Sequence, residues 1–187
     1  DWGTTLDGTE IASVDNQGVS NTQSNLMPDN YFLTVTDANG CESSDSESIT
    51  EPDLLTVDVV VSDSIKCNSD DDGELTATIT GGTANYNYVW GTSLDGNDVG
   101  EEFDTDQKTN IQSGLEPDDY FLTVTDANGC KARDSKSVTE PDMISVSAIV
   151  NDNSCYDLVD GNITISPEGG TGNLSVNWNG PNGFSST

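Results

Sequence analysis

The residues of this chain that could carry out chemistry are cysteines and carboxylates. The sequence has four cysteines and 34 Asp and Glu residues, and it has no His. No Ser stands beside a plausible base, and carboxylate pairs are too plentiful to single out an acid and a base. The sequence therefore predicts that the protein is not an enzyme. Paired cysteines outside the cytosol are typical of disulfides, so we predict that all four are oxidised: Cys41, Cys67, Cys130 and Cys155.

Closely spaced carboxylates point to a second kind of chemistry, the binding of calcium. Asp70, Asp71 and Asp72 lie in one loop before a glycine, and Asp157 and Asp160 occupy a similar loop further on. Calcium takes six to eight oxygens, commonly from Asp side chains and carbonyls around a glycine turn. The late Glu of a complete calcium loop is absent, so a solvated acidic turn fits equally. Residues 94–106 form another acidic stretch of this kind.

The charge of the chain excludes several classes of partner. Five Lys and Arg residues oppose the 34 acidic ones, which gives a formal net charge of -29. Binding to nucleic acid needs clustered Lys and Arg, and so does docking on anionic lipid. No apolar run approaches the roughly 18 residues of a membrane span. We therefore expect no nucleic-acid partner and no direct insertion into a membrane.

The chain repeats itself with a period of 88 to 89 residues. Residues 27–41 return almost letter for letter as 116–130, an offset of 89, and Glu-Pro-Asp at 51–53 returns at 140–142. On this period, residues 1–52 are the C-terminal half of one repeat, 53–141 are one complete repeat, and 142–187 are the N-terminal half of a third. A sandwich with half its strands missing cannot close its core, so we expect the sequence to be a window from a longer array.

Alternation of apolar and polar residues predicts that each repeat is an all-β, immunoglobulin-like sandwich. Several stretches have the period of two that half-buried strands require, and Gly, Asn, Asp and Pro separate them. Residues 92–114 are expected to add one or two short strands, and Asn128-Gly129 predicts a tight turn in which both residues tolerate positive φ. The strands expected in the complete repeat are 55–62, 74–80, 86–91, 119–125 and 131–139.

These motifs together resemble a known repeat family. Cys67, Gly81-Gly82-Thr83, the Tyr-x-Tyr-x-Trp of residues 86–90, and residues 120–130 ending in Asn-Gly-Cys are similar to the SprB-type repeat. That family occurs in tandem in very large surface adhesins of gliding and other Bacteroidetes bacteria and looks like immunoglobulin and polycystic-kidney-disease domains. The resemblance implies an extracellular, cell-surface or secreted adhesin. The chain departs from the family in lacking Pro before the aromatic residues and in its long acidic segment 92–114.

Two disulfide arrangements fit the sequence. Cys67 and Cys130 could pair within one repeat, closing a loop of 63 residues (130 minus 67). In a plain immunoglobulin-like order, however, these cysteines sit at opposite ends, about 30 Å apart, whereas a disulfide spans about 6 Å between Cα atoms. A bond between neighbouring repeats is the rival, and we take the bond within one repeat as the first hypothesis.

Aromatic residues have two interpretations. Tyr86, Tyr88 and Trp90 alternate on one strand, and rows of aromatic side chains can stack on sugars. Their position on a central strand favours core packing, against or beside Tyr120, Leu122 and Val124. Phe32 and Phe121 point to the opposite face and are better candidates for contact with a ligand.

Three residues match modification patterns. Asn162 and Asn173 begin N-glycosylation sequons, and Ser64 lies in an Asp-Ser-Ile segment that resembles an O-glycosylation pattern of Bacteroidetes.

The sequence thus predicts a structural or adhesive repeat region of a large extracellular adhesin or filament. A calcium-dependent carbohydrate-binding or spacer module of a secreted multidomain protein is the alternative, and a third reading has chains pairing laterally along strand edges. The expected partners are neighbouring repeats, other copies in a filament and surface polysaccharide, and the expected cofactor, if there is one, is calcium.

Overall fold

The computed structural model describes residues 2–3, 10–12, 21–181 and 184–186. The regular elements in these ranges are β-strands, and the chain divides into two compact units, residues 1–53 and 54–187. Among the described residues, none forms a helix with the length and apolarity of a membrane span. The fold is all-β and immunoglobulin-like, as the sequence predicts.

The first unit contains one antiparallel sheet in the order β2-β1-β3-β4. Its main part is the long hairpin of β3 and β4, in which Asp29 lies opposite Ile49 and Thr36 lies opposite Glu42. The strands are β1 (Trp2–Gly3), β2 (Glu10–Ala12), β3 (Asp29–Thr36) and β4 (Glu42–Ile49).

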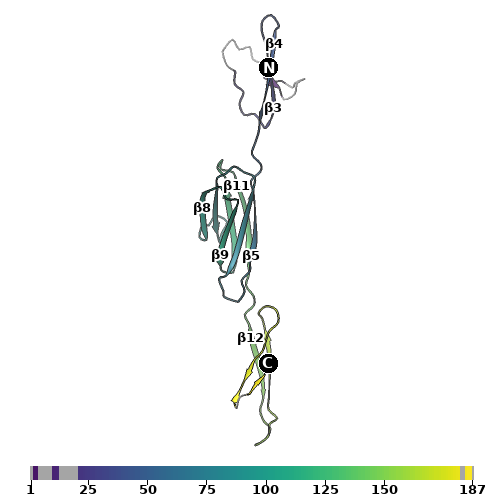
Figure 1. The fold of residues 1–187 in the computed structure, drawn as a ribbon, viewed down its shortest axis with the longest axis vertical. Coiled ribbons are helices and arrows are strands. Elements are labelled where there is room, and N and C mark those ends of the chain that lie inside the picture. The colour runs from purple at the N-terminus through teal and green to yellow at the C-terminus, as the bar shows by residue number, and fades with distance from the viewer. Residues whose placement is uncertain (1, 4–9, 13–20, 182–183, 187) are drawn as a thin grey trace. The chain divides into compact units, whose positions relative to one another are not determined.

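The middle repeat, residues 53–141, contains two antiparallel sheets. One has the order β5-β6-β9 and the other the order β11-β10-β7-β8 (Figure 1). The chain switches between the sheets at β6–β7, β8–β9 and β9–β10, so each sheet combines strands from both halves of the repeat. The strands are β5 (Thr56–Asp63), β6 (Gly73–Thr80), β7 (Tyr86–Gly91), β8 (Gly100–Thr105), β9 (Thr109–Leu115), β10 (Asp118–Thr125) and β11 (Lys131–Val138).

The core of the middle repeat lies between the two sheets. Alternate residues of three central strands are fully or almost fully buried: Leu75, Ala77 and Ile79 on β6, Tyr86, Tyr88 and Trp90 on β7, and Tyr120, Leu122 and Val124 on β10. The aromatic residues therefore pack in the core, as predicted. Strand β10 adjoins β7, with Leu122 opposite Trp90 and Val124 opposite Tyr88.

The polar atoms of the buried aromatic side chains are satisfied. Trp90 Nε1 donates to Asn110 Oδ1 at 2.8 Å, which joins β7 to β9 in the other sheet. The hydroxyl of Tyr86 donates to the Gly81 carbonyl at 2.8 Å, and the hydroxyl of Tyr88 donates to the Gln107 carbonyl at 2.7 Å. Burial raises the pKa of Tyr88 to about 12. Buried aromatic residues with a polar atom usually find such a partner.

The C-terminal segment, residues 142–187, repeats the first strands of the middle repeat. Val146 lies opposite Pro167 and Ala148 opposite Ile165, in the register of Val57 with Ile79 and Val59 with Ala77. The strands are β12 (Ser145–Asn151), β13 (Asn162–Glu168), β14 (Trp178–Asn179) and β15 (Ser185–Ser186).

The predicted strands of the middle repeat all form, with ends shifted by one residue or none, and the segment 92–114 contributes β8 and all of β9 except Leu115. The predicted tight turn at Asn128-Gly129 forms, and the Gly129 amide donates to the Asp126 carbonyl at 2.9 Å. Positive φ occurs at Gly129 (84°) but not at Asn128. Glycine adopts this left-handed region readily.

Truncation of a central core residue tests this packing. We expect Leu122→Ala to lower the free energy of unfolding by about 2–5 kcal/mol, because it leaves a cavity between the sheets. The matched control is Val60→Ala on β5. Because Val60 is 44% exposed, this substitution should lower the free energy of unfolding by less than about 1 kcal/mol. Urea unfolding followed by circular dichroism measures both, and equal losses would contradict the assigned core.

Candidate functional site at the ends of the middle repeat

The middle repeat has an incoming end, where the chain arrives at Leu55, and an outgoing end, where it leaves after Val138. At the incoming end, Gly82 packs against Leu55, and a Cβ atom added to Gly82 would lie 2.9 Å from Leu55 Cδ1. At the outgoing end, Gly73 packs against Ile65 and Val138, and a Cβ atom added to Gly73 would lie 3.3 Å and 2.8 Å from their side chains. Strands β5 and β11 contact each other. Both begin at the incoming end and finish at the outgoing end, so they run parallel.

Asp126 organises the incoming end. Its Oδ1 accepts hydrogen bonds from the backbone amides of Asn128 at 2.9 Å and Cys130 at 2.8 Å. Its Oδ2 accepts from the amide of Thr83 at 2.9 Å, in the loop between β6 and β7. Asn128 Nδ2 also donates to Thr83 Oγ1 at 3.0 Å. One carboxylate thus shapes the β10–β11 loop and ties it to the loop after β6.

These bonds lower the pKa of Asp126, first through the Thr83 amide and then through the amides of Cys130 and Asn128. Asp37, the equivalent residue in the first unit, accepts from the amides of Asn39 and Cys41, both at 2.8 Å, and its pKa is also lowered. The loop geometry therefore forms from the hairpin alone, whereas the bond to Thr83 requires the other half of the repeat. Asp126 is not among the residues predicted from the sequence, although an Asp three residues before each Gly is a visible signal.

Replacement of Asp126 tests its role. Because its folded pKa is depressed, Asp126 stabilises the fold above the ordinary value of 3.8, and this contribution is lost as pH falls through the lower folded pKa. We expect Asp126→Asn to lower the melting temperature at pH 7 and to weaken the decline in stability below pH 4. Exposed Asp70→Asn is the control. Thermal melts across pH 2–7 measure both effects, and parallel pH profiles for the two variants would argue against this role.

The outgoing end is held by the loop after β5. Asn68 Nδ2 donates to the Pro141 carbonyl at 3.1 Å, and the Ser69 amide donates to the Glu140 carboxylate. Lys66 forms ion pairs with Asp63 at 3.0 Å and Asp72 at 3.2 Å. These contacts fasten the Glu-Pro linker against the domain that it leaves.

Calcium binding at the predicted loops stays a prediction. Among the described residues, no group of three or more His, Cys, Asp or Glu side chains is placed to hold a metal ion. Asp72 instead accepts from the Lys66 amide and ammonium, and Asp160 accepts from the amide and hydroxyl of Ser154. Because these carboxylates fold their own loops, they do not converge with Asp70, Asp71 and Asp157. In the stretch 94–106, Asp98 is likewise engaged, with Thr92.

The four cysteines have free, exposed thiols. The first hypothesis, a bond between Cys67 and Cys130, does not fit the structure. Cys130 follows Asp126 at the incoming end, and Cys67 lies beside Asn68 at the outgoing end. Strand β11, with eight residues at about 3.3 Å each, alone spans about 26 Å, against the 6 Å that a disulfide bridges. Oxidation between neighbouring repeats stays a prediction.

Peptide mapping without reductant tests the cysteine assignment. We expect no peptide in which Cys67 is joined to Cys130, because closing that bond would require the sandwich to unfold. After purification under reducing conditions, all four thiols should react with an alkylating reagent in the folded protein. Recovery of a Cys67–Cys130 peptide from folded protein would contradict the strand order.

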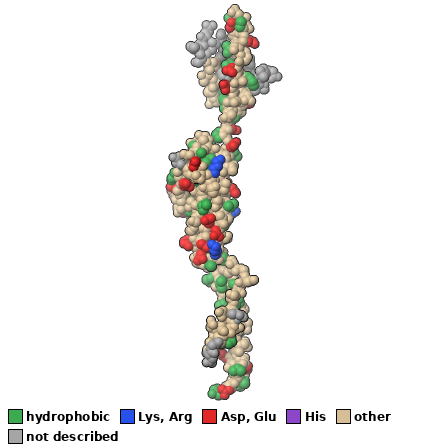
Figure 2. Space-filling view, viewed as in Figure 1, with side chains coloured by type: hydrophobic (Ala, Val, Ile, Leu, Met, Phe, Trp, Pro, Cys, Tyr) green, Lys and Arg blue, Asp and Glu red, His purple; other side chains and the backbone are tan. Residues whose placement is uncertain are grey.

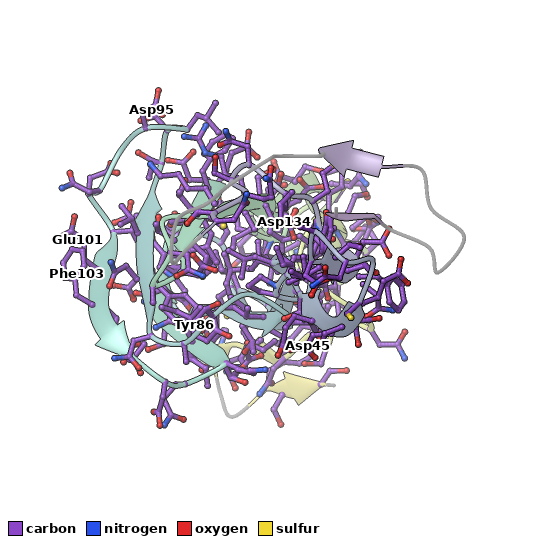
Figure 3. The ribbon with its side chains drawn as sticks, turned by 90° about the horizontal axis from the view of Figure 1, so that it is seen from above. Asp45, Tyr86, Asp95, Glu101, Phe103 and Asp134 are labelled. Carbon is purple, nitrogen blue, oxygen red and sulfur yellow. The ribbon has the colours of Figure 1, made fainter. Side chains whose placement is uncertain are left out.

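The outer face of β10 and β11 carries Phe121, the predicted contact residue. It is half-buried and lines a shallow hollow of about 450 Å³ with Asp119, Ser135, Lys136 and Ser137. Phe32 occupies the equivalent position in the first unit and is also half-buried. On the far edge of this sheet, Glu101 and Phe103 of β8 project outward (Figure 3).

The predicted glycosylation residues Ser64, Asn162 and Asn173 all have exposed side chains. Modification at each of them stays a prediction.

The family of SprB repeats matches two segments of the chain, residues 59–94 and 147–183. The resemblance to the SprB repeat is confirmed at these two segments. The two matches begin 88 residues apart (147 minus 59), which is the internal period of the sequence. The SprB repeat is a structural repeat of cell-surface proteins and not an enzyme family. No curated protein matches the chain.

Proposed function

We propose that these SprB repeats form the shaft of an extracellular adhesin or filament at the cell surface, in which each repeat acts as a load-bearing spacer. The observation that carries this proposal is the arrangement of the first and last strands of the middle repeat. They lie side by side and run parallel, and the chain enters and leaves the domain at opposite ends. Tension on the chain therefore pulls β5 and β11 past each other.

Asp134 is the main polar link between these strands. Its Oδ2 accepts a hydrogen bond from the Val59 amide of β5 at 2.7 Å, and its Oδ1 accepts from the amide of Ser135 at 2.8 Å. A hydrogen bond to a charged acceptor is stronger than a neutral one. When parallel strands are sheared, this bond and the packing around it must break together, so the arrangement favours resistance to force.

The surface charge supports a spacer role. Acidic side chains are spread over the viewed face with few basic ones among them (Figure 2). A chain with a formal charge of -29 repels its own copies and stays soluble. The shaft is thereby kept from collapsing onto neighbouring shafts.

Under this proposal, the hollow at Phe121 contacts surface polysaccharide. It combines an aromatic ring with hydroxyl and charged groups, the mixture of apolar and oriented polar groups that small-ligand sites use. The recurrence of Phe32 would give each repeat the same weak contact, and several weak contacts on one shaft add to strong adhesion.

Single-molecule stretching tests the load-bearing role. We expect Asp134→Ala to lower the unfolding force of the middle repeat pulled through its two ends, because a charge-assisted bond of about 1.5–3 kcal/mol is lost from the sheared interface. Asp58→Ala, an exposed residue of β5, is the matched control and should leave the force unchanged. If the two variants unfold at the same force, β5 and β11 do not bear the load.

A further inference from the structure

The hollow at Phe121 continues along the outer face of β10 and β11 toward the outgoing end. It adjoins a second hollow of about 450 Å³, and the two share Asp119 and Ser137. The second hollow is also lined by Pro117 and Thr139. We call the two hollows together the outer groove and define it by six residues: Pro117, Asp119 and Phe121 on one side, and Ser135, Ser137 and Thr139 on the other.

Strand pairing places these side chains on one face. Asp119 lies opposite Ser137 and Phe121 lies opposite Ser135, on the side away from the core. The Ser137 hydroxyl donates to Asp119 Oδ1. Among the described residues, Asp119 Oδ2 has no hydrogen-bond partner, and all the groove residues except the half-buried Phe121 are exposed. The groove therefore combines an aromatic ring with oxygens that can still bond to a ligand.

The same residues recur in the first unit, 89 positions earlier. Asn30 lies opposite Ser48 and Phe32 lies opposite Ser46, in the register of the groove. Phe32 is also half-buried, and the other equivalents are exposed. Five of the six residues are identical, and the sixth is Asn30 in place of Asp119: Pro28, Asn30, Phe32, Ser46, Ser48 and Thr50.

Strand β11 indicates that this recurrence is more than general similarity. Of its eight residues, only Asp134, Ser135 and Ser137 are identical to their equivalents on β4. The bond from the Val59 amide accounts for Asp134. Ser135 and Ser137 are exposed and lie outside the core, so packing does not require serine at either position. Their recurrence beside a phenylalanine points to a ligand that both repeats bind.

The charges at the groove differ between the two repeats. Lys136, which lines the hollow at Phe121, is replaced by Glu47 in the first unit, and Asp119 is replaced by Asn30. A site for an anionic sugar would need the cation in both repeats, and a site for a cationic ligand would need the carboxylate in both. The shared groups are apolar ring surface, hydroxyls and a side-chain oxygen that accepts hydrogen bonds. The ligand that fits both repeats is uncharged and rich in hydroxyls.

We infer that the outer groove of each repeat binds a linear, uncharged glycan. Phe121 would stack on the apolar face of one sugar ring, and Pro117, about 13 Å away by the rise of four extended residues, would contact a later unit. Between them, Asp119 Oδ2 would accept a hydrogen bond from a sugar hydroxyl. This inference rests on the proposed contact with surface polysaccharide and gives its chemical class and its residues.

The groove is shallow and exposed, so a single groove is expected to bind weakly. A polysaccharide offers many copies of the same sugar unit, and several grooves of one array can bind to it at once. Linked weak contacts of this kind add to a strong attachment.

Affinity electrophoresis of the 187-residue chain in native gels that contain a polysaccharide tests this inference. The neutral probes are mannan, dextran and a linear β-glucan, and the anionic probes are alginate and chondroitin sulfate. We expect at least one neutral probe to retard the chain relative to a gel without polysaccharide, and neither anionic probe to do so. Lys136→Glu, which gives the middle repeat the charge of the first unit at this position, should leave the retardation unchanged.

Paired variants remove the groove from both repeats. Phe32→Ala combined with Phe121→Ala should raise the dissociation constant for the neutral probe by at least about fivefold. Ser48→Gln combined with Ser137→Gln fills the groove without changing the charge or the core, and should have the same effect. The control is Phe103→Ala, an exposed phenylalanine on the far edge of the same sheet (Figure 3), which should bind as the unmodified chain does. Circular dichroism verifies that every variant keeps its strands.

The outcomes separate this inference from the proposed function. If only an anionic probe retards the chain, the contact with polysaccharide stands and the inference of an uncharged ligand is overturned. If no probe retards the chain, both fail, whereas the load-bearing role is judged by the stretching measurement alone. Retardation that survives both paired variants, or that Phe103→Ala abolishes equally, also overturns the inference.

Discussion

The structure depends on the burial of the aromatic face of β7 against the apolar face of β6. Tyr86, Tyr88 and Trp90 are buried between the two sheets. This burial requires β10 to pair with β7 and β9 to pair with β6. Because each sheet combines strands from the two halves of the repeat, neither half can bury its residues alone. The sandwich of the middle repeat therefore closes only when both halves are present.

A closed sandwich also fixes where the chain enters and leaves. Because β5 and β11 are parallel and are the first and last strands, the two linkers emerge at opposite ends of the repeat. Asp126 holds the β10–β11 loop against the loop after β6, and Asp134 holds β11 against β5. The same geometry that separates Cys67 from Cys130 makes the domain suited to carry tension. The proposed spacer role thus rests on strand order and not on any chemistry at the surface.

Much of this fold could be predicted from the sequence, because period-two alternation, Gly-rich turns and the 89-residue repeat are local signals. The core position of Trp90 and the placement of Cys67 and Cys130 at opposite ends of the repeat follow from strand order alone. The role of Asp126 could not be predicted, since its partner Thr83 is 43 residues away and is brought near only by folding. The hydrogen bonds of the acidic loops could not be predicted either: Asp72 and Asp160 bond to their own loops, and spacing alone does not distinguish a loop-forming carboxylate from a ligand.

Hydrogen exchange measured on the dilute, monomeric chain tests the central claim most directly. Strands β6 and β13 occupy equivalent places in successive repeats, but β6 pairs with a strand on each side, β5 and β9, whereas among the described residues β13 pairs with β12 alone. The account predicts that amides of β6 exchange only through global unfolding of the middle repeat, whereas those of β13 exchange much faster through local opening. Equal protection of β6 and β13 in the monomer would contradict the claim that each repeat closes only when its two halves meet.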